Sequence, residues 1–353
     1  MGKFMKFGVV VAVMLCAAGA FASNFRVADQ VYVPIAGHAA GSGGKTFVTD
    51  VFISNLSSDS VDVSVSFVQI GTSTIQQFNR LNGYVLTLAP GERREMVDFV
   101  GLPKAQGGLA LTGGLGQMVL NGCKALQDCT PDPASGENPN FRDISVETRI
   151  YSVDNANSAN PSQAPSNGQL FAGLAWYSYV SSDASASGLD RVFITALRNT
   201  GSAGQTGTYR TNLGFTNASQ FSTTTLLVKL FDGKTGAQIG SDRQVGPLAP
   251  LSSEQNGIAV YFPGFVGATA TNAYVTVEQI PTATQPTSDA TANGCPNGCP
   301  AFLTYGSLLD NATGDAITLE AQYLKKLTLD QVQCIYNLTC KGGTYKPHRA
   351  AKK

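Results

Sequence analysis

The chain has 353 residues, of which 43% are hydrophobic and 14% are charged, and its 24 basic residues balance its 24 acidic residues. Two lysines lie in residues 1–22, and seven basic residues with one acid lie in residues 325–353, so the body between them holds 15 basic and 23 acidic residues, a net charge of −8. An acidic body repels nucleic acid, which excludes that class of partner, and the length suffices for two ordinary domains.

The N-terminal region, residues 1–22, has the features of a secretory signal peptide. Lys3 and Lys6 form a basic start, an apolar run follows, and small residues surround a cleavage site that we place after Ala22. The apolar run is too short for a membrane span, and the residues before Cys16 lack the small side chains of a lipidation site. We therefore expect an exported protein without a membrane span, at the cell surface, in the medium or in the periplasm.

The segment that follows, residues 27–35 (VADQVYVPI), has two interpretations. It is either the first strand of its own domain or a strand donated to a neighbouring subunit, which would build a filament. We favour the first interpretation.

The glycine-rich stretch AAGSGGKT, residues 39–46, fits the relaxed form of a nucleotide-binding P-loop. A P-loop must open a helix that receives the phosphates, whereas a strand pattern begins directly after Thr46. The matching stretch at residues 201–208 keeps the glycines and loses the lysine. We interpret the stretch as a loop between two strands and assign it no nucleotide.

A repeat organises the chain. Residues 46–55 (TFVTDVFISN) return as residues 208–217 (TYRTNLGFTN), displaced by 162 positions. Two shorter matches follow in the same order at nearly the same offset: Leu88-Ala89-Pro90 with Leu248-Ala249-Pro250, and residues 152–155 with residues 308–311. Matches in one order at one offset indicate a duplicated domain.

Both copies have the two-residue period of half-buried strands, in residues 61–67 and again in residues 226–230. Further strands are predicted at residues 145–153, 273–277 and 302–309, and proline and glycine recur between them. We predict an all-β fold of two tandem immunoglobulin-like β-sandwiches, residues 23–168 and residues 169–324. A short C-terminal helix and a disordered basic tail complete the prediction, in residues 325–353.

The segment between the copies, residues 169–180 (QLFAGLAWYSYV), is predicted to be a connecting strand and holds the only tryptophan, Trp176. Its aromatic side chains could stack on sugars, but a strand that alternates aromatic residues more often fills a core or a domain interface.

Six cysteines follow the predicted cleavage site, an even number that suits an oxidising compartment. They fall into three close pairs, and we predict local disulfides: Cys123 with Cys129, Cys295 with Cys299, and Cys334 with Cys340.

The residues that could support catalysis or bind a metal are few. His38 and His348 are the only histidines, which argues against a histidine zinc site or a Ser-His-Asp triad. Residues 310–315 (DNATGD) could offer oxygen ligands to calcium, but such turns usually bond their own backbone. The charged cluster of residues 92–98 is interpreted as a solvated loop. We predict no catalytic residue, cofactor or metal.

The combined motifs resemble a known group of proteins. They are V-Y-V-P-x-A-x-H before a glycine-rich loop, T-x-x-T-D-[VL] at a strand start, L-A-P-G, and D-N-x-x-G-D. This pattern, over residues 31–315, resembles uncharacterised exported bacterial proteins with tandem immunoglobulin-like or fibronectin-like sandwiches, found alone or attached to secreted enzymes. The first copy departs from the pattern at residues 154–157, where no G-D follows. The resemblance implies a fold, but no activity and no functional residue.

We expect a non-catalytic surface or extracellular protein that acts in structure, adhesion or protein binding, with a protein or glycan partner at the cell surface. One alternative is a carbohydrate-binding accessory module of secreted hydrolases. Another alternative is a subunit that assembles with itself into a β-strand-complemented filament. The third alternative is an enzyme.

Overall fold

The computed structural model describes the chain in sections: residues 27–41, 44–129, 138–154, 161, 167–175, 180–181, 191–219, 223–280 and 301–323. The predicted signal peptide, the C-terminal helix and tail, and Trp176 lie outside the described residues. The same holds for four of the six cysteines: Cys295, Cys299, Cys334 and Cys340.

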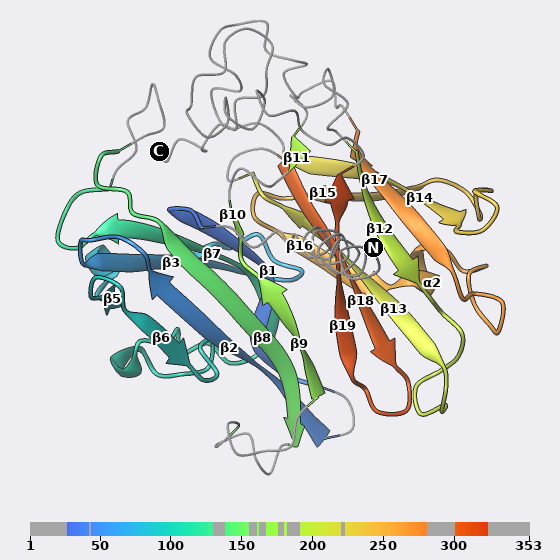
Figure 1. Cartoon of the computed structure of the whole chain (residues 1–353), viewed down its shortest axis with the longest axis horizontal. Coiled ribbons are helices and arrows are strands. Elements are labelled where there is room, and N and C mark those ends of the chain that lie inside the picture. The colour runs from blue at the N-terminus through green and yellow to red at the C-terminus, as the bar shows by residue number, and fades with distance from the viewer. Residues whose placement is uncertain are drawn as a thin grey trace, which may run out of the picture.

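The described residues confirm the predicted all-β fold (Figure 1). The N-terminal half contributes β1 (Gln30–Ala40), β2 (Lys45–Asn55), β3 (Val61–Gln69), β4 (Gln76–Phe78), β5 (Thr87–Leu88), β6 (Arg93–Met96), β7 (Gly114–Lys124) and β8 (Ile144–Asp154). The connecting segment holds β9 (Asn167–Ala172), β10 (Leu174–Ala175) and β11 (Val180–Ser181). The C-terminal half contributes β12 (Arg191–Leu197), β13 (Tyr209–Asn217), β14 (Thr224–Asp232), β15 (Arg243–Leu248), β16 (Ser253–Gly257), β17 (Ala273–Gln279), β18 (Ala301–Asp310), β19 (Ala316–Glu320) and β20 (Gln322–Tyr323). The helical turns among these residues are short: η2 (Arg80–Asn82), η3 (Lys104–Gln106) and α2 (Ile258–Tyr261).

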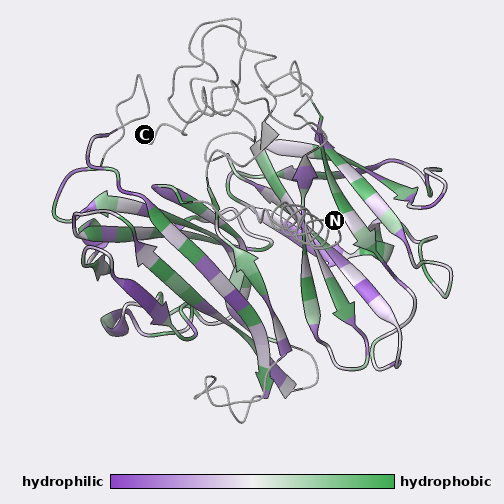
Figure 2. Ribbon diagram, in the orientation of Figure 1, coloured by the Kyte–Doolittle hydropathy of each residue, from purple (hydrophilic) through white to green (hydrophobic). Residues whose placement is uncertain are grey.

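The strands form because apolar residues alternate with polar ones along them. In β3, Val61, Val63, Val65 and Phe67 are buried, whereas the polar residues between them keep solvent contact. Figure 2 shows the same alternation as bands of green and purple along the strands of both halves. Each such strand buries one face, so two sheets must pack against each other.

The two halves repeat one pattern of antiparallel pairing. In the N-terminal half, β2 pairs with β6 and β8, and β8 pairs with β9 (sheet A); β7 pairs with β3 and β1, and β1 pairs with β10 (sheet B). In the C-terminal half, β13 pairs with β16 and β18, and β18 pairs with β19 (sheet C); β17 pairs with β14 and β12, and β12 pairs with β20 (sheet D). The strand pairing therefore agrees with the duplication inferred from the sequence.

Two repeated residues have structural roles that explain their repetition. The Asn55 side-chain amide donates to the carbonyl of Ala89 at 2.9 Å, and Asn217 donates to the carbonyl of Ala249 at 3.0 Å. In both copies the asparagine that ends the repeated strand thus holds the Leu-Ala-Pro turn. The repeated motifs maintain the fold and are no sign of a ligand.

The connecting segment belongs to both halves. Strands β9 and β10 pair with β8 and β1 of the N-terminal half, whereas β11 pairs with β18 of the C-terminal half. The predicted boundary between residues 168 and 169 falls inside β9. Strand β1, which covers most of the proposed donor segment, pairs with β7 of its own chain.

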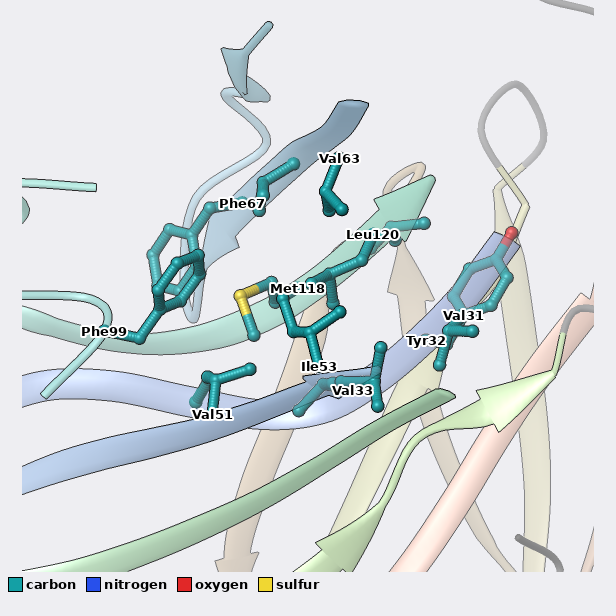
Figure 3. Close-up of a cluster of buried hydrophobic side chains, with 14 of the residues drawn as sticks. Val31, Tyr32, Val33, Val51, Ile53, Val63, Phe67, Phe99, Met118 and Leu120 are labelled. Carbon is teal, nitrogen blue, oxygen red and sulfur yellow. The ribbon is translucent and has the colours of Figure 1, made fainter. Parts of the chain in front are cut away.

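The core of the N-terminal half lies between sheets A and B (Figure 3). Val51 and Ile53 of β2 meet Met118 and Leu120 of β7, and Phe99 closes one side. Each of these side chains is fully buried or nearly so. The C-terminal half has its own cluster between sheets C and D.

The N-terminal core is completed by residues of the C-terminal half. Ala218, Leu251 and Leu303 belong to the same buried cluster as β1, and the Tyr32 hydroxyl donates to the carbonyl of Ala218 at 3.1 Å. Residues of both halves therefore build the N-terminal core, which we call the shared core, whereas the C-terminal half keeps a core of its own.

A second contact between the halves lies beside β1 and β9. Phe171 of β9 meets Tyr305 of β18 edge to face, with ring centroids 5.2 Å apart. The Tyr305 ring crosses Gly214, where an added Cβ would lie 2.1 Å from the ring, and its hydroxyl donates to Gln255 at 2.6 Å. This contact uses the outer face of sheet C, so that face serves as a docking surface for the N-terminal half.

Replacement of Phe171 by alanine tests the packing between the two halves. Phe171 is 3% exposed, and its loss leaves a cavity against Tyr305, so we expect the free energy of unfolding to fall by about 3–5 kcal/mol. Urea unfolding should remain one cooperative transition. Leu170→Ala in the same strand is the matched control, because Leu170 is 65% exposed and its loss should change stability little. Separate transitions for the two halves would contradict the conclusion that their packing makes them unfold together.

Candidate functional site

An imidazole–carboxylate pair lies at the end of β1 in the N-terminal half. His38 Nδ1 is 2.8 Å from Asp98 Oδ2, and both side chains are largely buried, at 22% and 14% exposed. Asp98 adopts a left-handed backbone conformation with φ of 51°, which is uncommon for a residue other than glycine. Gly101 lies directly beside the pair, because an added Cβ there would be 2.4 Å from His38 Nδ1. The surrounding backbone thus fixes the geometry of the pair.

A second carboxylate supports the first. Asp50 of β2 accepts the backbone N–H of Asp98 at 3.0 Å and the hydroxyl of Tyr151 at 2.9 Å. The Tyr151 ring lies against the guanidinium of Arg149, 4.3 Å from its centroid. These groups connect β1, β2, β8 and the loop after β6 into one buried polar network, which we call the His38 cluster (His38, Asp50, Asp98, Tyr151 and Arg149).

The environment of the cluster shifts its titrations. The hydrogen bond with Asp98 raises the pKa of His38 above its ordinary value, and burial opposes this effect only in part. Burial raises the pKa of Asp50, against the opposing hydrogen bonds from Asp98 and Tyr151. Burial, followed by the charge of Asp50, raises the pKa of Tyr151. His38, Asp50 and Tyr151 therefore hold their protons more tightly than they would in solvent.

The sequence interpretation of residues 92–98 as a solvated loop was wrong for Asp98, which is a largely buried partner of His38. Glu92 also has a structural role, since it accepts the backbone N–H of Ala89 at 2.7 Å. No local signal in the sequence marked this pair, because 60 positions separate His38 from Asp98.

The C-terminal half shows that the fold does not require this cluster. Thr49 Oγ1 bonds the backbone of Gly37, and Thr211 Oγ1 bonds the backbone of Arg198 in the same way, so His38 corresponds to Asn199. The strand registers likewise match Asp50 with Asn212, Asp98 with Ile258 and Tyr151 with Leu309. The second copy forms the same strands without any of these titratable groups.

The chemistry available to the cluster is limited. An aspartate that orients an imidazole can support general-base catalysis when a nucleophile lies within hydrogen-bond reach of the other ring nitrogen. In the described sections, His38 has no recorded hydrogen bond to a serine, threonine or cysteine. The same sections hold no group of three or more His, Cys, Asp or Glu side chains arranged for a metal ion. The cluster fits a structural, pH-sensitive clamp.

The outer face of sheet A extends from this cluster. The face carries charged and aromatic side chains that contact one another. Arg93 and Glu147 are 3.6 Å apart with side chains 64% and 47% exposed, and the guanidinium of Arg93 lies 5.6 Å from the ring centroid of Phe52. Leu170 at the β9 edge is 65% exposed. We call these residues, with Arg149, face A.

The other stretches that the sequence singled out have structural roles. The P-loop-like stretch joins two paired antiparallel strands, as predicted, with Ala40 opposite Thr46, and Lys45 Nζ is 2.6 Å from Asp154 Oδ1. The Asp310 carboxylate accepts the backbone N–H groups of Ala312 and Thr313 at 2.8 and 3.0 Å, as expected for a turn that bonds its own backbone. Cys123 and Cys129 form the predicted local disulfide, and the other two predicted pairs lie outside the described residues.

No protein-family model matches the chain, and no curated protein matches its sequence. No helix within the described ranges is long and apolar enough to cross a membrane.

Replacement of His38 by glutamine tests the clamp. The raised native pKa means that protonated His38 stabilises the fold fully below its unfolded pKa of about 6.5, and that this stabilisation is lost as the pH rises through the native pKa. We therefore expect wild type to lose more stability than His38→Gln as the pH rises above about 6.5. Urea unfolding at a series of pH values measures the free energy of unfolding of both proteins. The contribution of Asp50 cancels in the difference between them, because both proteins retain Asp50. Parallel pH profiles would refute the clamp.

Proposed function

We propose that the protein is an exported, non-catalytic binding protein built from two tandem immunoglobulin-like β-sandwiches, and that it binds a partner polypeptide through face A. In this proposal the sandwiches act as one rigid body that presents face A at the cell surface or outside the cell. The buried His38 cluster holds the strands beneath that face and does not act on a substrate.

The observation that carries the proposal is the different use of one face in the two copies. The outer face of sheet C is covered by the N-terminal half, through Tyr305 and its contact with Phe171. On the matching face of sheet A, Glu147 stands where the second copy has Tyr305 and Phe52 stands where it has Gly214, and the Glu147 side chain is 47% exposed. A position that docks polypeptide in one copy is thus open to solvent in the other.

The composition of face A supports a polypeptide partner. Arginine and aromatic residues, phenylalanine included, are enriched at protein–protein interfaces. Arg93 is positioned by Phe52 and Glu147, which lowers the conformational freedom that binding would remove. These contacts favour a protein partner over the glycan alternative.

Binding to isolated cell envelopes of the producing organism tests the proposal. We expect the mature protein to bind saturably and the double variant Arg93→Ala/Glu147→Ala to bind about tenfold more weakly, because it removes two exposed anchors of face A. The matched control is Lys229→Ala/Asp242→Ala, a 3.4 Å charge pair in the C-terminal half that should leave binding unchanged.

Size-exclusion chromatography and electron microscopy of the same samples show whether the protein assembles with itself. Equal binding by both double variants, or no saturable binding by the wild type, would contradict a role for face A.

A further inference from the structure

The C-terminal half contacts the N-terminal half with one end of its sandwich. Two residues at that end carry the contact: Ala218, which follows Asn217, and Leu251, which follows the Leu-Ala-Pro turn. Both side chains are 2% exposed and belong to the shared core. We call Ala218 and Leu251 the second tip.

The N-terminal half receives the second tip on the outer face of sheet B. Tyr32 of β1 and Gln117 of β7 point to that face, because the residues that alternate with them along the strands point into the sandwich. The Tyr32 hydroxyl donates to the carbonyl of Ala218 at 3.1 Å, and the Gln117 amide nitrogen, in the orientation that gives it acceptors, donates to the carbonyl of Leu251 at 3.1 Å. Both receiving side chains are 1% exposed.

The duplication supplies a second example of the tip, and this one is open to solvent. Leu56 corresponds to Ala218 and Gly91 corresponds to Leu251, because they follow the same repeated asparagine and the same Leu-Ala-Pro turn. Gly91 and Leu251 also share a left-handed backbone conformation, with φ of 70° and 54°. Leu56 is 58% exposed, and Gly91 is exposed as well. We call Leu56 and Gly91 the first tip.

The receiving face is repeated on sheet D. Tyr32 corresponds to Phe193 and Gln117 corresponds to Tyr274, because the pairing of β1 with β7 and of β12 with β17 shifts register at the same place. Tyr274 stacks on Phe231 of β14, with ring centroids 5.1 Å apart, and lies 5.9 Å from Phe193 on its other side. We call this row of three rings face D.

Face D is open where its counterpart in the N-terminal half is covered. The three rings keep part of their surface in contact with solvent, whereas Tyr32 and Gln117 are buried under the second tip. Figure 1 shows β14 and β17 on the side of the C-terminal half that lies away from β2 and β3. The chain therefore carries both sides of its own internal contact a second time, with neither side covered.

The first position of the open tip fits face D through apolar contact. Within the chain, the small Ala218 lies at Tyr32, whereas a docked first tip would bring Leu56 to Phe193. Phe193 lacks the hydroxyl that bonds the Ala218 carbonyl, and its ring offers apolar surface to the larger leucine side chain. Removal of Leu56 from water would favour the contact.

The second position fits through an exchange of volume. Within the chain, Leu251 lies at Gln117, whereas a docked first tip would bring Gly91 to Tyr274. Glycine carries no side chain, so it leaves room for the larger ring. The Tyr274 hydroxyl is also a donor and can replace the Gln117 amide at the carbonyl of the tip.

We propose that the first tip of one molecule docks on face D of a second copy of this chain, as the second tip docks on sheet B within the chain. Each molecule has one first tip and one face D, so the contact is heterologous and joins molecules head to tail. Ser145 stands where Leu303 completes the internal contact, so the association is weaker than the packing within the chain. The inference goes beyond the proposed function, because it uses the first tip and face D instead of Arg93 and Glu147.

Sedimentation velocity of the mature protein over a concentration series tests the inference. We expect the average mass to rise with concentration, through dimers to larger species. Leu56→Asp places a charge on the first tip and Phe193→Asp places one on face D, so each should weaken the association at least about tenfold. The matched control is Leu81→Asp, at a leucine that is 98% exposed outside the first tip, which should associate as the wild type does.

A mixture of the two blocked variants identifies the surfaces that meet. Leu56→Asp keeps face D intact, and Phe193→Asp keeps the first tip intact. Each variant alone should be monomeric, whereas the mixture should form a dimer and no larger species, because no further surface is left to extend the chain. Urea unfolding shows whether each variant is folded, and Tyr274→Ser takes the place of Phe193→Asp if that variant is unfolded.

A wild type that stays monomeric, an association that Leu56→Asp leaves unchanged, or a mixture without dimers would overturn the inference. The outcomes also separate this inference from the proposed function. Envelope binding that depends on Arg93 and Glu147, without self-association, would refute only the docking of the first tip on face D. Self-association that depends on Leu56 and Phe193, without envelope binding, would refute only the proposed function.

Discussion

The packing of one β-sandwich into the open end of the other is the contact on which the structure depends. Tyr32, buried in the N-terminal core, donates its hydroxyl to the carbonyl of Ala218 in the C-terminal half, and Leu303 completes the same cluster. Phe171 and Tyr305 close the end of the sheets a short distance away. A flexible linker would let two domains reorient, whereas side chains of one half that pack into the core of the other fix the relative orientation of the halves. Face A and the C-terminal half therefore keep a fixed geometry.

The duplication separates what the fold needs from what it does not. Both copies keep the asparagine that holds the Leu-Ala-Pro turn and the threonine that bonds the first strand, and both keep the same strand pairing. They differ at the His38 cluster and on the outer faces of sheets A and C. Differences on a shared framework mark the positions where the copies acquired separate roles.

The sequence predicted the strands well because their signal is local. The alternation of Val61, Val63 and Val65, for example, appears within a few residues. The His38 cluster could not be predicted in this way, because its members come from strands that only the fold brings together. The role of Phe171 was hidden for the same reason: it lies in a connecting segment, and its partner belongs to the other half.

The shared core also orders the events by which the protein matures. Leu303 and Tyr305 follow Phe171 by more than 130 positions, so the N-terminal sandwich cannot reach its final packing while the chain is still emerging. Until those residues arrive, Phe171 and the apolar end of β1 stay open to other contacts, which is the state in which partly folded chains aggregate. If the chain emerges with its N-terminus first, that surface must therefore be protected until almost the whole polypeptide is available.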